Sequence, residues 1–199
     1  MMPPLIATFA ELKDYWRLEV LGAPGKPLRL KRLLRRVTAG ESPSFLFWYR
    51  LAQFLYCRPR GLLNYRKLAE RINRRLIRRH NIEILLGARI GPGLRLPHRM
   101  GICVSNLAVI GRNVMIRQHT TIGIKSDDPA QLVGIFIGDN VSLGAHVCIV
   151  GDHLTIGDNV VVGAGALVMR DIPADSLYYS RHEAVVRPLP GATPGDGAR

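Results

Sequence analysis

Aliphatic residues recur at every sixth position across residues 83–173. Glycine directly follows many of them, as in the Ile-Gly pairs at 90–91, 110–111, 122–123 and 156–157. A six-residue spacing matches neither the helical period of about 3.6 residues nor the alternation of a half-buried strand. It predicts a solenoid of short strands and tight turns, with one aliphatic residue per strand pointing inward. The four runs are Ile84, Ile90, Leu96 and Ile102; Ile110, Ile116 and Ile122; Ile137, Leu143 and Ile149; and Ile156, Val162 and Val168.

Residues 1–82 show a different pattern, with apolar residues at helical spacing. The spacing predicts two helical stretches, interrupted at Pro59–Gly61. We therefore divide the chain into a mostly helical region (1–82), a solenoid (83–173) and a partly disordered C-terminal extension (174–199). The apolar positions of the two helical faces are Phe47, Leu51, Phe54 and Leu55, and Leu68, Ile72, Leu76 and Ile77.

The net positive charge lies entirely in the helical region. Residues 1–80 hold 18 Lys and Arg against 5 Asp and Glu, which accounts for the whole net charge of +13, and the remainder is balanced. The cysteines Cys57, Cys103 and Cys148 form no C-x-x-C pair, which argues against a disulfide framework or a zinc knuckle. With no signal peptide and no apolar run of about 18 residues, a cytoplasmic protein is expected.

The segment "EILLGARIGPGLRLPHRMGICVSNLAVIGRNVMIRQHTTIG" resembles the hexapeptide-repeat acyltransferases. Within them it is most similar to the serine O-acetyltransferase branch and its relatives in surface-polysaccharide synthesis. The resemblance implies a mainly β fold, a left-handed parallel β-helix with three hexapeptides per triangular coil, preceded here by the helical region. It also implies a homotrimer that uses acetyl-CoA and needs no metal.

Counting hexapeptides around such a triangle assigns the aliphatic residues to three faces. The count requires two extra residues near positions 106–108, and a loop leaving the helix between Ile122 and Ile137. The faces are Leu96, Ile116, Ile137 and Ile156; Ile84, Ile102, Ile122, Leu143 and Val162; and Ile90, Ile110, Ile149 and Val168.

The resemblance assigns His98, in "LPHRMGI", as the general base that removes the acceptor's hydroxyl proton. Imidazole suits this task because its ordinary pKa lies near neutral pH. Glu83, fifteen positions earlier, aligns with the family's aspartate. We expect it one strand spacing away, about 4.8 Å, where it orients the imidazole. His98 and Glu83 are the predicted catalytic pair.

The resemblance also points to a cofactor groove between subunits. Gly123, Ala145 and Ala164 are the expected cofactor-binding residues, because small residues leave room for the pantetheine arm. Backbone N–H groups near Gly123 are expected to stabilise the developing oxyanion. The count of hexapeptides places Ile124 in one column with the two alanines.

The remaining histidines raise an alternative. His119 follows His98 by about one coil and is a candidate substrate contact, whereas His146 and His153 are typical turn residues. A zinc-dependent γ-carbonic-anhydrase-like enzyme uses the same helix with three histidines between subunits. Its paired ligands are five positions apart, however, whereas His146 and His153 are seven apart.

The acceptor predicted from the sequence is a sugar or a lipid-linked glycan precursor. Pro97 replaces the family's acidic residue before the base, and the family's Arg-His pair is missing from the following loop. Asp127 and Asp128 in that loop would repel a carboxylate and are candidate substrate contacts instead. Serine O-acetylation in cysteine biosynthesis is the alternative.

The basic N-terminal region leaves three readings open. The first is a solvated helical face, and the second is a surface that binds a membrane peripherally. The third is a surface that binds nucleic acid, although nucleic acid is not the partner we expect. Membrane binding rests on aromatic residues beside arginines, the composition of an interfacial helix. These residues are Phe45, Phe47, Trp48, Tyr49 and Phe54, with Arg50, Arg58 and Arg60.

Overall fold

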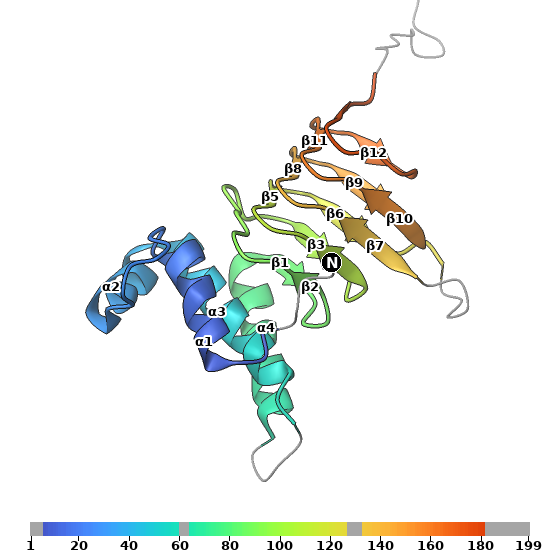
Figure 1. Cartoon of the computed structure of the whole chain (residues 1–199). Helices are drawn as coiled ribbons and strands as arrows, with labels where there is room; N and C mark the ends of the chain where they lie inside the picture. Colours follow the sequence, from blue (N-terminus) through green and yellow to red (C-terminus); the bar gives the residue numbers. More distant parts are fainter. Residues whose placement is uncertain (1–5, 60–63, 127–132, 182–199) are drawn as a thin grey trace, which may run out of the picture.

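A layer of helices covers one end of a solenoid of short strands (Figure 1). The computed structural model describes residues 6–59, 64–126 and 133–181. No helix in this described part is long and apolar enough to cross a membrane. The helices are α1 (Phe9–Tyr15), the π-helix η1 (Trp16–Val20), α2 (Leu30–Ala39), α3 (Glu41–Tyr56) and α4 (Tyr65–His80).

The solenoid is a left-handed parallel β-helix, as predicted, and its strands form three sheets. Sheet A has the order β1 (Ile82–Ile84), β3 (Ile102–Val104), β6 (Thr121–Gly123), β9 (Cys148–Val150), β12 (Leu167–Val168). Sheet B has the order β10 (His153–Ile156), β7 (Gly134–Ile137), β4 (Ala108–Ile110), β2 (Arg89–Ile90). Sheet C has the order β13 (Leu177–Tyr178), β11 (Val161–Val162), β8 (Ser142–Leu143), β5 (Met115–Ile116).

The predicted assignment of residues to faces is wrong beyond the first coils. Ile137 pairs with Ile110 in sheet B, and not with Ile116 as the hexapeptide count proposed. The segment between Ile122 and Ile137 takes the place of a single corner. The chain therefore passes from sheet A directly to sheet B, as it does in the other coils. The buried columns are Ile84, Val104, Ile122, Ile149 and Val168 in sheet A; Ile90, Ile110, Ile137 and Ile156 in sheet B; and Leu96, Ile116, Leu143 and Val162 in sheet C.

Asparagines at the corner between sheets B and C hold successive coils together. Asn113, Asn140 and Asn159 have positive φ angles, which asparagine tolerates better than most residues. Each donates a side-chain hydrogen bond to the next residue of the column, at 3.1 Å, 3.1 Å and, for Asn159 to Asp175, 2.8 Å. The asparagines thus form a ladder of hydrogen bonds parallel to the helix axis.

The helical layer hydrogen-bonds to the open edge of the first coil. Arg50, whose side chain is fully buried, donates to the carbonyl oxygens of Ile90 and Gly91 at 2.9 Å. Gln53 donates to the carbonyl of Ala88, and Asn73 to that of Ile84. Unpaired strand edges are prone to aggregate. These side chains satisfy the first coil's carbonyls and cover its edge.

Glu19 completes this cap from the other side. Its carboxylate accepts hydrogen bonds from Arg50 at 2.6 and 2.9 Å and from the backbone N–H groups of Gly93 and Leu94 at 3.1 Å. Burial alone would lower the pKa of Arg50, but the adjacent Glu19 carboxylate more than offsets this and holds that pKa above its usual value. Arg50 therefore remains a charged group inside the protein.

Much of the predicted membrane-binding surface of the N-terminal region is buried, although Trp48 is 40% exposed and Arg60 lies outside the described residues. Phe45, Tyr49 and Phe54 lie in the core with at most 8% of their surface exposed, and Arg50 is buried with them. Helix α3 is surrounded by α1, η1, α2 and α4, so it is apolar on several sides rather than on one face. The aromatic residues therefore build the helical layer.

Candidate functional site

His98 lies on a bulge at the corner between sheets C and A. Residues 95 and 115 bridge across the coils, and the N–H of His119 donates to the carbonyl of Met100 at 2.7 Å. Leu96 stacks on Ile116, and Gly101 lies beside His119. Between these two contacts the lower coil advances by five positions, from Leu96 to Gly101. The upper coil advances by only three, from Ile116 to His119. The two extra residues are thus in 97–100, and not at 106–108 as predicted. The bulge carries the exposed His98 side chain outward from the corner.

Glu83 lies on the adjacent outer face of sheet A. It occupies the middle of β1 opposite Cys103 of β3, the strand that follows the bulge. Its carboxylate is 3.9 Å from the Cys103 sulfur, and burial together with this carboxylate raises the pKa of the Cys103 thiol. Glu83 and His98 are both exposed and make no hydrogen bond to each other in the described structure. Glu83 lies one strand below the strand that follows the bulge, and the structure does not pair it with His98.

Two stacked histidines lie at the same corner in the next two coils. His119 and His146 both have positive φ angles, 56° and 58°, and their rings stack with centroids 4.7 Å apart. The His119 ring also lies against Gly101, where an added Cβ would come within 2.5 Å of Nδ1. His119 therefore adjoins the bulge that carries His98.

The predicted cofactor-binding residues separate into two groups. Ala145 and Ala164 stack at the corner of sheets C and A, in line with Met100 and Gln118 below them. Gly123 ends β6 at the opposite edge of sheet A, four residues or about 13 Å beyond His119. The alanines thus lie on the side of His98 in the same chain, and Gly123 and Ile124 do not. The error in face assignment explains why Ile124 was expected beside them.

Three features of this corner escaped the sequence prediction. Arg95 and Arg117 are exposed, and Arg99 follows His98 in the bulge. The signal was the repeated arginine next to an aliphatic position, in "LRLPH" and "IRQH". In addition, the Oε1 atom of Gln118 is buried without a hydrogen-bond partner among the described residues.

His119, His146 and His153 do not converge on one point. His153 lies in β10 on sheet B, edge-on to Phe136, whereas His119 and His146 lie at the opposite corner. Within residues 6–59, 64–126 and 133–181, no group of three or more histidine, cysteine or carboxylate side chains is arranged to bind a metal ion. Asp127 and Asp128, the candidate substrate contacts, lie outside the described residues.

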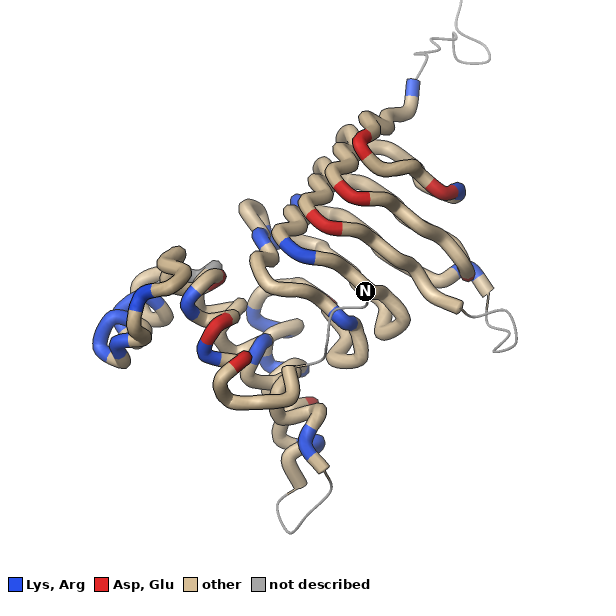
Figure 2. The backbone as a smooth tube through the Cα atoms, viewed as in Figure 1, with Lys and Arg blue, Asp and Glu red and all other residues tan. Residues whose placement is uncertain are grey.

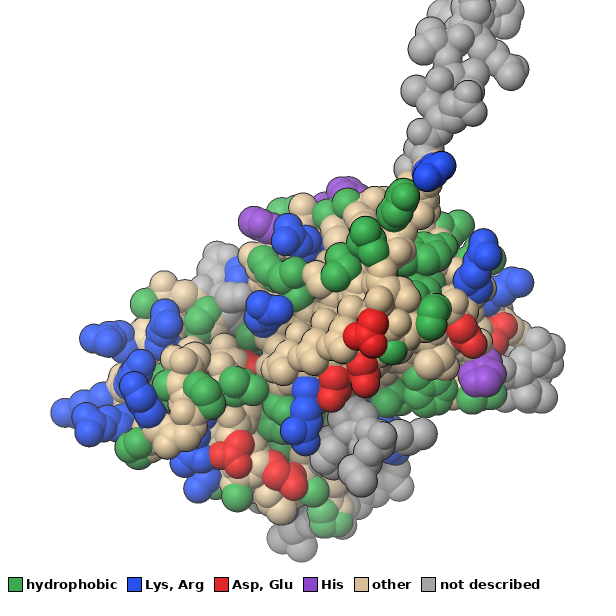
Figure 3. Space-filling model, turned by 45° about the horizontal axis from the view of Figure 1, so that its top comes forward, with side chains coloured by type: hydrophobic (Ala, Val, Ile, Leu, Met, Phe, Trp, Pro, Cys, Tyr) green, Lys and Arg blue, Asp and Glu red, His purple; other side chains and the backbone are tan. Residues whose placement is uncertain are grey.

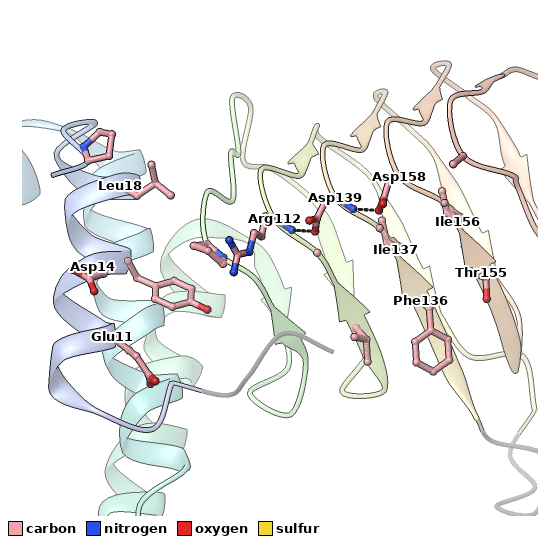
Figure 4. A pocket seen from close by; sticks show the side chains of 18 of the residues that line it. Glu11, Asp14, Leu18, Arg112, Phe136, Ile137, Asp139, Thr155, Ile156 and Asp158 are labelled. Atoms are coloured by element: carbon pink, nitrogen blue, oxygen red, sulfur yellow. Dashed lines mark hydrogen bonds between the residues drawn. The ribbon is translucent and has the colours of Figure 1, made fainter. Parts of the chain in front are cut away.

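A concavity of about 1150 Å³ lies away from His98 (Figure 4). It is the space between α1 and the outer face of sheet B, and Tyr15, Arg112 and Phe136 are among its lining residues. The Asp139 and Asp158 carboxylates there accept backbone N–H bonds from the preceding coils. It contains no histidine or cysteine to act as base or nucleophile. The corner around His98 is therefore the better candidate for acyl-transfer chemistry.

No family model matches the chain. Among curated proteins, mitochondrial serine acetyltransferase 3 of Arabidopsis thaliana is 37% identical over 125 residues, 63% of this chain and 30% of that protein. Serine acetyltransferase 2 of the same plant is 32% identical over 139 residues, covering 70% and 41%. Serine acetyltransferase of Synechococcus elongatus is 32% identical over 94 residues, covering 47% and 38%. The chain spans less than half the length of each relative.

Solved structures of similar fold carry the same name. Serine acetyltransferase isoform 3 of Entamoeba histolytica, bound to cysteine, has a TM-score of 0.70 at 22% identity over 92% of this chain and 63% of that one. Soybean serine acetyltransferase bound to serine has a TM-score of 0.65 at 26% identity, covering 86% and 68%.

These relatives correct one expectation from the sequence. They are serine acetyltransferases, so the prediction of a sugar or glycan acceptor, and of a role in polysaccharide synthesis, is wrong. That prediction took the missing Arg-His pair and Pro97 as evidence that nothing holds a carboxylate. It overlooked the arginines that flank the bulge.

Proposed function

We propose that this chain, a member of the hexapeptide-repeat acyltransferase superfamily, transfers an acetyl group from acetyl-CoA to the hydroxyl of serine. The observation that best supports this proposal is the bulge, which presents His98 beside a column of small residues. The relatives of the chain are serine acetyltransferases. A base next to an open groove is what direct transfer requires.

The corner above His98 fits the pantetheine arm of coenzyme A. Ala145 and Ala164 offer no side chain beyond a methyl group, and Gln118 offers a buried oxygen that lacks a donor. An amide N–H of the arm would satisfy that oxygen. Acetyl-CoA, when bound, supplies the acyl group as a reactive thioester.

His98 is proposed to take the proton of the serine hydroxyl on a ring nitrogen as that oxygen attacks. It then returns the proton to the departing thiolate. Glu83, one strand below Cys103, is proposed to stabilise the imidazolium once the acceptor has drawn the two side chains together. Apo structures often show such contacts before they tighten.

Arg95 and Arg117 are proposed to hold the carboxylate of serine. Arg95 lies in the coil of His98, and Arg117 lies in the next coil, directly after Ile116, which stacks on Leu96. Neither has an ion-pair partner among the described residues. An arginine can pair with a carboxylate through two parallel hydrogen bonds. They would replace the family's Arg-His pair, which is missing from this sequence, as the contact for the carboxylate.

The site is proposed to be complete only in an oligomer, the trimer implied by the resemblance. Gly123 lies across sheet A from His98, so a second copy must bring its own Gly123 edge to this corner for both to act on one substrate. Hydrophobic side chains are exposed on the outer surface of the solenoid (Figure 3). They include Met100, Val161, Leu167, Met169 and Leu177, with 46–68% exposed.

The test is release of free thiol from acetyl-CoA by the purified protein, with and without L-serine. Serine-dependent release is expected, and His98→Asn should lower its kcat by about 10²–10⁴-fold. Asparagine keeps a polar side chain of similar size, and circular dichroism checks the fold. Release without dependence on serine, or an active His98→Asn variant, would overturn the proposal.

A further inference from the structure

Helix α2 is the outermost helix of the helical layer and lies far from the solenoid (Figures 1 and 2). It packs on α3 and η1 through Leu33, which is 2% exposed, and through the half-buried Val37. Leu30 and Leu34, one helical turn apart, remain 65% and 52% exposed. One side of α2 is therefore held by the protein, and the adjoining apolar side is not.

Basic side chains lie on the side of α2 away from the protein core, with Lys31 and Arg35 next to the two leucines and Arg32 on the opposite side of the helix. They line a concavity of about 580 Å³ that has no acidic residue in its wall. Between Val20 and Gly40 the sequence contains no Asp or Glu, and the preceding Glu19 is committed to Arg50. None of the basic residues forms an ion pair with a described side chain. The lining residues are Lys26, Pro27, Arg29, Lys31, Arg32 and Arg35.

The combination selects among anionic partners. A second α2 would bring cations against cations, so it is not the occupant. Nucleic-acid phosphates would satisfy the arginines but would leave Leu30 and Leu34 in water. An anionic lipid surface satisfies both, because headgroups pair with the cations while leucines enter the acyl boundary.

We propose that α2 docks the protein on anionic lipid membranes. Lys31 and Arg35, which lie next to the two leucines on the surface of α2, contact phosphate headgroups, and Leu30 and Leu34 insert between them. The proposal is independent of the enzymatic activity, because no residue of the corner around His98 takes part. The whole solenoid stays off the membrane in this arrangement.

The test is flotation of the full-length protein with vesicles of phosphatidylcholine, with or without about one-third phosphatidylglycerol. Binding only to the anionic vesicles is expected, and raised salt should weaken it. Each basic residue near such a surface contributes about fivefold to affinity, so Lys31→Gln with Arg35→Gln should cost about 25-fold. Leu30→Gln with Leu34→Gln should cost at least about tenfold without altering charge.

The matched control is Arg74→Gln with Arg78→Gln, on the exposed side of α4. It removes the same charge from the same helical layer, and unchanged vesicle binding is expected. Equal loss in this control would overturn the proposal, as would equal binding to neutral vesicles. If the protein did not bind the vesicles but bound a single-stranded RNA oligonucleotide through α2, the proposal would be overturned in favour of a nucleic-acid-binding surface.

Discussion

The imidazole of His98 stands outside the corner because the loop that carries it is two residues longer than the corner above it. In the next two coils the corresponding corner carries His119 and His146, whose rings stack along the axis instead. Chemically identical side chains therefore take different positions because the backbone of one corner is longer. The bulge, rather than the presence of a histidine, distinguishes the proposed base.

Arg117→Leu tests the proposed carboxylate contact. Loss of a charge-assisted bond should raise KM for L-serine by about 10- to 100-fold and leave KM for acetyl-CoA unchanged. The wild type should prefer L-serine to L-serinamide, which lacks the carboxylate, and the variant should not. Arg170→Leu, an exposed arginine after β12, is the control. Undiminished preference for serine in Arg117→Leu would place the carboxylate elsewhere.

The Cys103 thiol reports on Glu83. Its raised pKa leaves less thiolate at neutral pH, so alkylation by iodoacetamide should require more alkaline solution than for an ordinary cysteine. Glu83→Gln removes the neighbouring negative charge, which should lower that pKa and speed alkylation near pH 8. Peptide mass spectrometry resolves the three cysteines. An unchanged rate at Cys103 would show that the carboxylate does not act on the thiol.

At the scale of elements, the buried pair of Arg50 and Glu19 joins the helical layer to the first coil. Glu19→Gln should lower the free energy of unfolding by about 3 kcal/mol or more, because it leaves the buried guanidinium without a counter-charge. Urea denaturation measures this. A loss below about 1 kcal/mol would mean that the backbone carbonyls satisfy Arg50 unaided.

Adding Arg50→Met to Glu19→Gln provides the matched comparison. The double variant removes both charges and should be less destabilised than Glu19→Gln alone. Hydrogen exchange at Gly93 and Leu94 should accelerate in both variants, since both of these N–H groups lose a carboxylate acceptor.

Six-residue periodicity was sufficient to predict a solenoid, because the strand interiors obey it strictly. It was insufficient to predict the faces, because corners absorb extra residues without disturbing the period on either side. The segment before Ile137 is one such corner and the bulge at His98 is another. Local spacing also failed in α3, where Phe45 and Tyr49 face neighbours that only tertiary packing supplies.

On the scale of the whole molecule, the net positive charge lies at one end, whereas exposed apolar side chains occur on both the helical layer and the solenoid. The helical layer carries the positive excess, and the C-terminal coils expose leucine, valine and methionine side chains (Figures 2 and 3). A balanced solenoid can associate through these coils without electrostatic cost, whereas the helical layer repels its copies. The proposed cofactor site and the proposed contact between copies therefore belong to the same part of the chain.

Leu167→Glu with Met169→Glu tests this assembly. Two carboxylates in the exposed apolar surface should shift the protein toward monomers and reduce thiol release together. Analytical ultracentrifugation gives the mass, and Leu68→Glu on α4 is the control. A monomeric variant with full activity would show that one chain makes a complete site.

The cap formed by Glu19, Arg50, Gln53 and Asn73 gives synthesis of this protein a direction. The ribosome synthesises the helices before the solenoid. The cap, with its hydrogen-bond donors in place, therefore precedes the first coil. Each later coil then finds a finished edge on which to dock, as in other repeat proteins where stability grows from neighbour to neighbour. A nascent chain stalled anywhere in the repeat therefore leaves just one growing edge exposed.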